Sequence, residues 1–329
     1  MLDEFLSAFS VWFGDQQQAL FETLVQPLMY AVGWGNLLED AYTATGWLMV
    51  GVIQLVLMVV LIGTLQRLYP AERGMHWRAM APDVFYTLLH RLGVFRVAMF
   101  FLVEPLVDQC FGWGAVHGVQ GFQLDALVAP WWPGWTDTAW FSLLLYLVVF
   151  DFVDYWIHRG QHASNRWWAL HAVHHSQREM TMWSDNRNHL LDDLLRDLIF
   201  AVVARAVGVA PGQFVAVVAI TLTLESLSHA NTRLRFGAVL DKLLVDPRFH
   251  RVHHAIGIGH ESQGKGSLGG CNYAVLFPVW DILFGTANYR SPIEPTGIRD
   301  QLHDEGARDY GQTVWAQQWL GIKRLAGWA

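Results

Sequence analysis

Long apolar segments alternate with short polar ones along most of the chain. The first uninterrupted segment covers residues 47–68 and has no charged residue before Arg67. A second covers residues 84–110, with its basic residues at the start, and a third covers residues 140–157. About 20 apolar residues in a helix cross the roughly 30 Å hydrocarbon layer of a bilayer. The pattern therefore predicts three membrane-spanning helices.

Two further apolar segments, residues 190–207 and 212–228, flank the sequence VAPG. Pro and Gly break helices, so these segments predict a helical hairpin. Five charged residues interrupt the first arm, and we expect it to lie partly inside the protein. Residues 1–45 mix apolar and acidic positions and predict two short amphipathic helices on the membrane surface, with a span across residues 19–35 as the alternative.

Basic residues predict the orientation. No Lys or Arg occurs before Arg67 or between Arg96 and Arg159. Cytoplasmic segments are enriched in Lys and Arg, so the N-terminus and the 113–139 loop are expected outside, and the region from 158 onward inside. The expected fold is an all-α, integral-membrane helical bundle with a cytoplasmic histidine-rich dimetal cap. Its predicted parts are interfacial helices (1–45), transmembrane helices with an extracytoplasmic loop (46–139), a catalytic domain (140–290) and a cytoplasmic tail (291–329).

Composition agrees with a membrane protein and excludes other classes. Hydrophobic residues make up 53% of the chain and charged residues 16%, whereas a soluble domain carries about a quarter of charged residues. The formal net charge of -7 gives no basic field for binding nucleic acid. Only two cysteines occur, Cys110 and Cys271, so neither a disulfide framework nor a cysteine-ligated metal centre is expected.

Histidines supply the candidate chemistry, since 11 of the 15 fall between residues 158 and 260. Three groups stand out, HRGQH (158–162), HAVHH (171–175) and HRVHH (250–254). Imidazoles at i, i+3 and i+4 share one face of a helix and can reach one centre. The three groups hold more imidazoles than one ion can bind, so two metal ions are predicted, and Fe, Zn, Cu and Ni all suit imidazole. Arg159 follows the first histidine, where a zinc-protease motif requires Glu.

These boxes, followed by Asn272-Tyr273 and by WDILFGT at 280–286, resemble the fatty acid hydroxylase superfamily, which includes sterol desaturases and alkylglycerol monooxygenase. The resemblance covers about residues 140–290. His189 looks like part of an HPLD element of several branches, with Leu190 in place of the usual Pro. The resemblance implies ten metal ligands: His158, His162, His171, His174, His175, His189, His229, His250, His253 and His254.

Acidic and polar residues near the boxes are candidates for orienting the ligands. Asp154 lies one helical turn before His158, and Glu225 one turn before His229. Each carboxylate could accept the free imidazole N–H and fix the coordinating tautomer. Glu225 could instead be a ligand or simply buried. Asp192 and Asn272 complete this supporting set.

The resemblance implies an O2-dependent monooxygenase that hydroxylates an unactivated C–H bond of a lipid-like substrate, fatty acyl, sterol or related, reached from the bilayer. It implies two Fe ions, with Zn possible in purified protein, and a separate electron donor (a reductase, ferredoxin or cytochrome). A bacterial inner membrane is the expected location. Desaturation on the same scaffold is the first alternative, and a non-redox zinc membrane hydrolase or a metal-binding transporter the second.

Two features near the last box are given no role. Residues 264–269 (GKGSLG) formally match the GxGxxG pattern of nucleotide-binding proteins. That pattern requires a preceding strand and a following helix, and neither is expected here, so we predict a loop. His260 is expected to lie outside the metal site.

Overall fold

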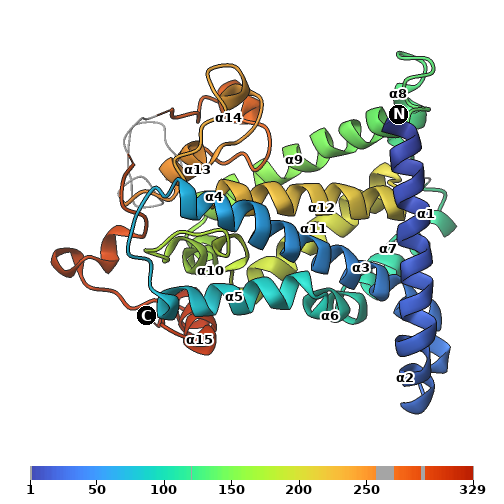
Figure 1. Ribbon diagram of the computed structural model, residues 1–329, viewed down its shortest axis with the longest axis horizontal. Helices are drawn as coiled ribbons and strands as arrows, with labels where there is room; N and C mark the ends of the chain where they lie inside the picture. Colours follow the sequence, from blue (N-terminus) through green and yellow to red (C-terminus); the bar gives the residue numbers. More distant parts are fainter. Residues whose placement is uncertain (1, 120, 257–269, 290–292, 329) are drawn as a thin grey trace.

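The fold consists of helices joined by loops, with one isolated β-bridge in the described part of the chain. The computed structural model describes four stretches of residues: 2–119, 121–256, 270–289 and 293–328. His260 and residues 264–269 lie outside the described residues. The long helices run side by side along the molecule and form one bundle (Figure 1). The predicted all-α helical bundle is confirmed.

Three helical segments are long and apolar enough to span a membrane, namely Gly35–Leu68, Ala139–Ala163 and Pro211–Ser228. The first contains α3 (Leu38–Leu57), a π-helical turn (Met58–Ile62) and α4 (Gly63–Leu68). The predicted spans 47–68 and 140–157 therefore both lie within such helices, as expected of an integral membrane protein.

The predicted second span is bent. It consists of α5 (Trp77–Arg91) followed by α6 (Val94–Leu102) and α7 (Glu104–Val116). The two halves meet at an angle of 55°, so together they form either a broken span or a re-entrant segment. The break falls at Gly93, whose φ of +79° is a conformation that other residues rarely adopt.

The predicted helical hairpin is present as α11 (Leu190–Val207) and α12 (Pro211–Ser228). Gly208 ends α11 with a φ of +68°, and an added Cβ there would meet the carbonyl oxygen of Phe122 at 2.7 Å. Pro211 opens α12, where its missing N–H costs no helical hydrogen bond. α11 is not among the candidate spans, in keeping with its five charged residues.

α9 (Ala139–Ala163) links the bilayer region to the histidine boxes. At 1.5 Å per residue, its 25 residues reach roughly 38 Å, more than the hydrocarbon layer requires. Its buried face carries Phe150, Asp154 and His158, whereas Leu144 and Trp156 are exposed. The helix therefore presents one side to lipid and the other to the protein interior.

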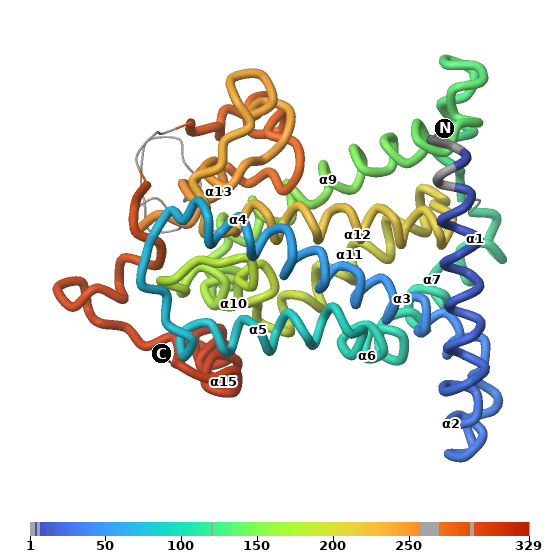
Figure 2. Tube along the Cα trace, in the orientation of Figure 1, coloured from blue at the N-terminus to red at the C-terminus, as the bar shows by residue number. Residues whose placement is uncertain are grey.

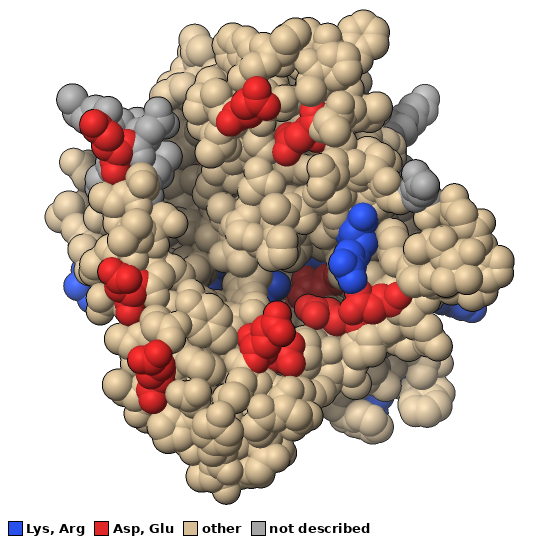
Figure 3. Space-filling view, turned by 90° about the vertical axis from the view of Figure 1, so that its right-hand side faces the viewer, with Lys and Arg blue, Asp and Glu red and all other residues tan. Residues whose placement is uncertain are grey.

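α1 (Leu2–Leu20), a π-helical turn (Phe21–Val25) and α2 (Gln26–Ala31) form one nearly continuous helical run instead of two separate short helices. The run lies across one end of the bundle (Figure 2), and it exposes large apolar side chains such as Phe9 and Trp12. A helix lying in the plane of the membrane surface has this arrangement. Figure 3 shows this end of the molecule, with several acidic and few basic side chains and with charged atoms inside a central hollow.

The remaining helices are mostly short. α8 (Leu124–Val128) follows α7 in the 113–139 loop. At the end of the bundle away from α1 lie α10, α13, α14 and α15 (Figure 1). Their bounds are Asn165–His175, Pro247–His253, Val279–Leu283 and Val314–Leu325. α15 packs against α10, so this C-terminal helix is part of the packed histidine-rich end of the bundle.

Candidate metal centre

Nine of the ten predicted ligands converge in two groups at the end of the bundle opposite α1. Within each group, one ligand atom from every residue lies within 4.8 Å of the others, and every member is buried. The first group contains His158, His162, His171, His175 and His253, and the second contains His174, His229, His250 and His254. We refer to these as the five-histidine group and the four-histidine group.

Each of the two HxxHH boxes contributes imidazoles to both groups. His171 and His175 belong to the five-histidine group, while His174 between them belongs to the other. The last box is the reverse, because His253 joins the five-histidine group and His250 and His254 join the other. The i, i+3, i+4 spacing therefore places each box between two centres, in addition to placing its imidazoles on one helix face.

Local capping holds the two boxes in helical form. α10 begins after Ser164, whose hydroxyl accepts a hydrogen bond from the Trp167 N–H (3.4 Å). α13 begins after Asp246, whose carboxylate accepts from the N–H groups of Arg248 (2.8 Å) and Phe249 (2.7 Å). Such caps satisfy helical N–H groups that would otherwise be left without an acceptor.

Close contacts between ring nitrogens show that the groups fit metal ions. The His229 Nε2 atom lies 3.0 Å from His250 Nε2 and 3.2 Å from His174 Nε2. In the other group, the Nε2 atoms of His175 and His253 are 3.1 Å apart. Nitrogens bound to one ion at about 2.0–2.1 Å lie roughly 3 Å from one another, so these spacings match a shared ion in each group.

The protonation state also suits metal binding. Burial lowers the pKa of the His253 imidazole to about 3. The same cause lowers the pKa of four neighbouring imidazoles: His174, His175, His250 and His254. These rings are therefore neutral near pH 7, and neutral imidazole is the form that binds metals.

Backbone carbonyls hold several rings in place. The Nδ1 atom of His158 donates to the Tyr273 carbonyl (2.8 Å), and that of His253 donates to the Cys271 carbonyl (2.6 Å). An acceptor at Nδ1 fixes the tautomer whose Nε2 lone pair can face an ion.

The predicted roles of the Asp154 and Glu225 carboxylates are wrong. His229 Nδ1 does bond to Glu225, but to its backbone carbonyl (2.8 Å) and not to its side chain. Both carboxylates instead bind Arg196, which donates from Nε to Asp154 (2.8 Å) and from Nη2 to Glu225 (3.2 Å). A guanidinium with five donors competes for buried carboxylates more effectively than one imidazole N–H.

The prediction that His189 is a metal ligand is also corrected, because this residue belongs to neither histidine group. Its Nε2 bonds to the Gln318 carbonyl (2.9 Å), and its Nδ1 accepts from the Leu191 N–H (3.2 Å), which caps α11. Both nitrogens are therefore occupied by the protein. α15 approaches so closely that a Cβ at Gly321 would lie 2.3 Å from the His189 ring.

Asp192 and Asn272, the other two residues predicted to support the ligands, make different kinds of contact. Asp192 accepts from His171 Nδ1 (3.1 Å) and also from Trp167 Nε1 (2.6 Å), so it orients an imidazole of the five-histidine group. Asn272 adopts a φ of +58° and donates to the Phe249 carbonyl (2.8 Å). It therefore ties the segment after 270 to α13 without bonding to a ligand ring.

Sequence reasoning missed the role of Asp281. Its carboxylate accepts from the N–H groups of Tyr273 (2.9 Å) and Ala274 (2.8 Å) and from the Thr286 hydroxyl (2.6 Å). These bonds fix the loop segment whose Tyr273 carbonyl accepts from His158. The WDILFGT motif contains both Asp281 and Thr286. The sequence therefore marks these two residues, but it does not show that Asp281 binds backbone N–H groups.

Substituting Asp192 tests the support of the five-histidine group. In Asp192→Asn, we expect the affinity for metal to fall by about 10–100-fold, because such outer contacts usually have effects of that size. Competition with a graded chelator series measures it. Asp304→Asn is the control, since the Asp304 side chain is 98% exposed and belongs to neither histidine group. Equal metal retention in both variants would contradict the role of Asp192.

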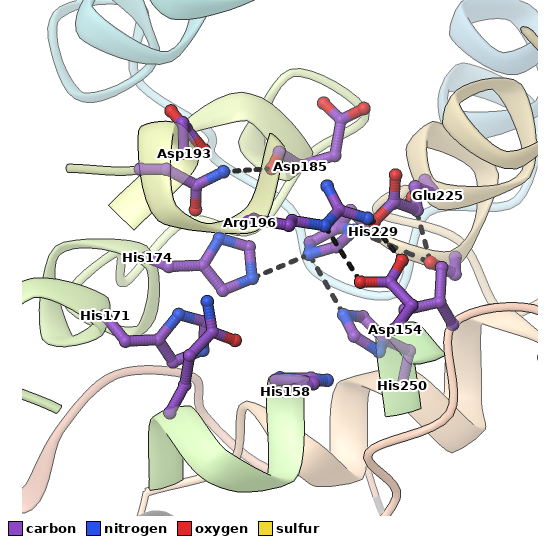
Figure 4. A pocket seen from close by; sticks show the side chains of 14 residues that line it. Asp154, His158, His171, His174, Asp185, Asp193, Arg196, Glu225, His229 and His250 are labelled. Atoms are coloured by element: carbon purple, nitrogen blue, oxygen red, sulfur yellow. Dashed lines mark hydrogen bonds and ion pairs between the residues drawn. The ribbon is translucent and has the colours of Figure 1, made fainter. Parts of the chain in front are cut away.

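A cavity lies beside both groups. Figure 4 shows the imidazoles that line it together with Arg196, which bridges Asp154 and Glu225. Five of the candidate ligands contribute to the lining: His158, His171, His174, His229 and His250. The two histidine groups therefore border a shared space inside the bundle.

Residues 143–286, which contain all nine imidazoles, match the fatty acid hydroxylase family. This part of the chain belongs to the fatty acid hydroxylase superfamily. The suspected resemblance is therefore confirmed.

Three relatives, each named for a different activity, are similar to parts of this chain. Ornithine lipid hydroxylase OlsE of Rhizobium tropici is 28% identical over 240 residues, which are 72% of this chain and 66% of that protein. Alkylglycerol monooxygenase of Homo sapiens is 29% identical over 157 residues, 48% of this chain and 32% of that protein. Very-long-chain aldehyde decarbonylase GL1-6 of Oryza sativa subsp. indica is 22% identical over 216 residues, 61% of this chain and 30% of that protein.

The chain thus spans about two thirds of the length of the ornithine lipid hydroxylase and about a third of the other two. No solved structure matches it significantly.

Proposed function

We propose that this chain is an O2-dependent, non-haem di-iron oxygenase that hydroxylates an unactivated C–H bond of a lipid-like substrate. The observation that carries the proposal is the pair of buried histidine groups beside a cavity in a membrane helical bundle. The relatives support it, since two of them are named for lipid hydroxylation and for monooxygenase activity. When bound, the two ions would supply O2 activation.

The residues of the chain would contribute binding, orientation and exclusion of water. The five-histidine and four-histidine groups would each hold one ion. The Tyr273 and Cys271 carbonyls and the Asp192 carboxylate keep their imidazoles aimed inward. Because all nine imidazoles are buried, bulk water has little access to the reacting atoms.

The substrate would reach the cavity from the bilayer, and ornithine lipid is the first candidate because of the relative that aligns with 72% of this chain. Fatty acyl and sterol substrates stay open. Hydroxylation with O2 consumes two electrons, and we propose that a separate reductase, ferredoxin or cytochrome supplies them. We propose a location in a bacterial inner membrane, and the distribution of basic residues supports an N-terminus outside and a metal centre on the cytoplasmic side.

Isotope labelling tests the reaction. The purified protein in ornithine-lipid vesicles, with a reductase and ferredoxin, is expected to yield a hydroxylated lipid carrying one 18O atom from 18O2. Removing iron with a chelator should abolish product, and adding iron(II) but not zinc should restore it. An unsaturated, unlabelled product would instead favour the desaturase. Product formed without O2 would overturn the oxygenase and favour the zinc hydrolase.

A further inference from the structure

A second cavity, of about 130 Å³, lies next to the histidine cavity, between α5–α6, α9, α11 and α12. The two cavities adjoin, because Asp154, Arg196 and Glu225 line both. Phe150, Phe200 and other apolar side chains form part of its wall. This space could hold a polar group together with a short apolar segment.

The lining of this second cavity is unusually acidic for the interior of a membrane bundle. Among the described residues, the cationic groups in this lining are the guanidinium groups of Arg96 and Arg196 and the imidazole of His90. Seven carboxylates line the cavity: Glu104, Asp151, Asp154, Asp185, Asp193, Asp197 and Glu225.

Some of these carboxylates have compensating partners. Asp151 accepts from two backbone N–H groups and from the Trp280 indole, and Asp185 accepts from Arg91 (2.8 Å). Asp154 and Glu225 share the single positive charge of Arg196. The lining therefore holds more carboxyl groups than cationic groups.

Asp193 shows this excess most directly. The residue is 7% exposed, and its Oδ2 atom has no hydrogen-bond donor. The nearest cationic partner is the His90 imidazole, whose Nε2 lies 3.2 Å from Oδ2 and forms an ion pair with it only when the ring is protonated. The Oδ1 atom of Asp185 is likewise buried without a donor. Buried carboxylate oxygens without donors are costly, and a bound cation with N–H groups would relieve that cost.

We propose that this second cavity binds the protonated amine of an amphiphilic substrate, with Asp193 as a specificity-determining residue. This deepens the proposed function and rests on it, since it names the substrate class of the same site. An ammonium group supplies both the positive charge and the donors that the carboxylates lack. A free fatty acid would add another negative charge to the cavity. A sterol hydroxyl is uncharged and would neutralise none of the carboxylates.

Binding of water-soluble short amphiphiles tests the proposal without turnover. Hexylamine, hexanol and hexanoate are titrated calorimetrically into the metal-loaded, detergent-solubilised protein under nitrogen. We expect hexylamine to bind at least about tenfold more tightly than the other two, and Asp193→Asn to weaken it by about tenfold or more, as for a hydrogen bond to a charged group. Asp108→Asn is the matched control, since Asp108 is 56% exposed, pairs with Arg205 and lies outside the cavity lining.

Equal binding of the three compounds, or unchanged hexylamine affinity in Asp193→Asn, would overturn the proposal. If Asp193→Asn does not fold, Asp197→Asn removes a second lining carboxylate and is judged by the same criterion. The two proposals can fail separately. Amine binding without O2-dependent product would refute the oxygenase alone, whereas hydroxylation of an amine-free lipid by a protein indifferent to hexylamine would refute the substrate class alone.

Discussion

Alanine at His174 is expected to abolish turnover and to lower the metal content from two ions to about one per chain. His174 is one of only four imidazoles in its group, and its Nε2 atom lies 3.2 Å from that of His229. The loss should exceed the roughly 10–100-fold effect typical of outer contacts, because a ligand itself is removed. Turnover assays and metal analysis of the purified variant measure both effects.

Membrane insertion of the His174→Ala protein should be unchanged, since the apolar helices do not depend on this residue. Membrane fractionation checks this point. His303→Ala serves as the matched control, because the His303 side chain is 98% exposed and lies outside both groups. Normal turnover in His174→Ala would show that the middle box is not part of the ligand set.

The convergence of the histidine boxes could be predicted because helical spacing is a local property. An i, i+3, i+4 pattern fixes which imidazoles point the same way, whatever the rest of the chain does. The division into two groups could not be predicted, because it depends on how α9, α10 and α13 pack. His174 and His175 are neighbours in sequence, yet they belong to different groups.

The errors at Asp154 and Glu225 have the same origin. Each lies one helical turn before a candidate ligand, and spacing alone made a direct contact plausible. Only tertiary packing brings Arg196 of α11 between α9 and α12, where it binds both carboxylates. His189 was misplaced for a similar reason, since its partner Gln318 lies 129 residues further along the chain.

The apolar spans were the most predictable part of the fold, because their length requirement comes from the bilayer and not from packing. The break at Gly93 escaped prediction, because a single glycine between Leu92 and Val94 does not by itself end a helix pattern. The role of the WDILFGT motif was the hardest to predict. Its Asp281 accepts hydrogen bonds from backbone N–H groups. A contact made to backbone leaves no pairing signal in a single sequence.

Replacing Arg196 by methionine is expected to destabilise the folded protein by about 3–5 kcal/mol. The side chains of Arg196, Asp154 and Glu225 are 19%, 4% and 14% exposed, so the substitution would leave two buried carboxylates without their shared cation. Removing one member of a buried charged set costs more than the set itself contributes, because the remaining charges stay desolvated. Denaturant unfolding in detergent, followed by circular dichroism, measures the change.

Two further variants separate this effect from simple loss of an arginine. Arg205→Met removes an arginine from the same helix, but Arg205 and its partner Asp108 are both 56% exposed, so the cost should stay below about 1 kcal/mol. Adding Asp154→Asn and Glu225→Gln to Arg196→Met removes the uncompensated charges and should recover much of the lost stability. Equal costs for Arg196→Met and Arg205→Met would mean that water reaches the carboxylates, and the acidic cavity would then have no energetic need for a bound cation.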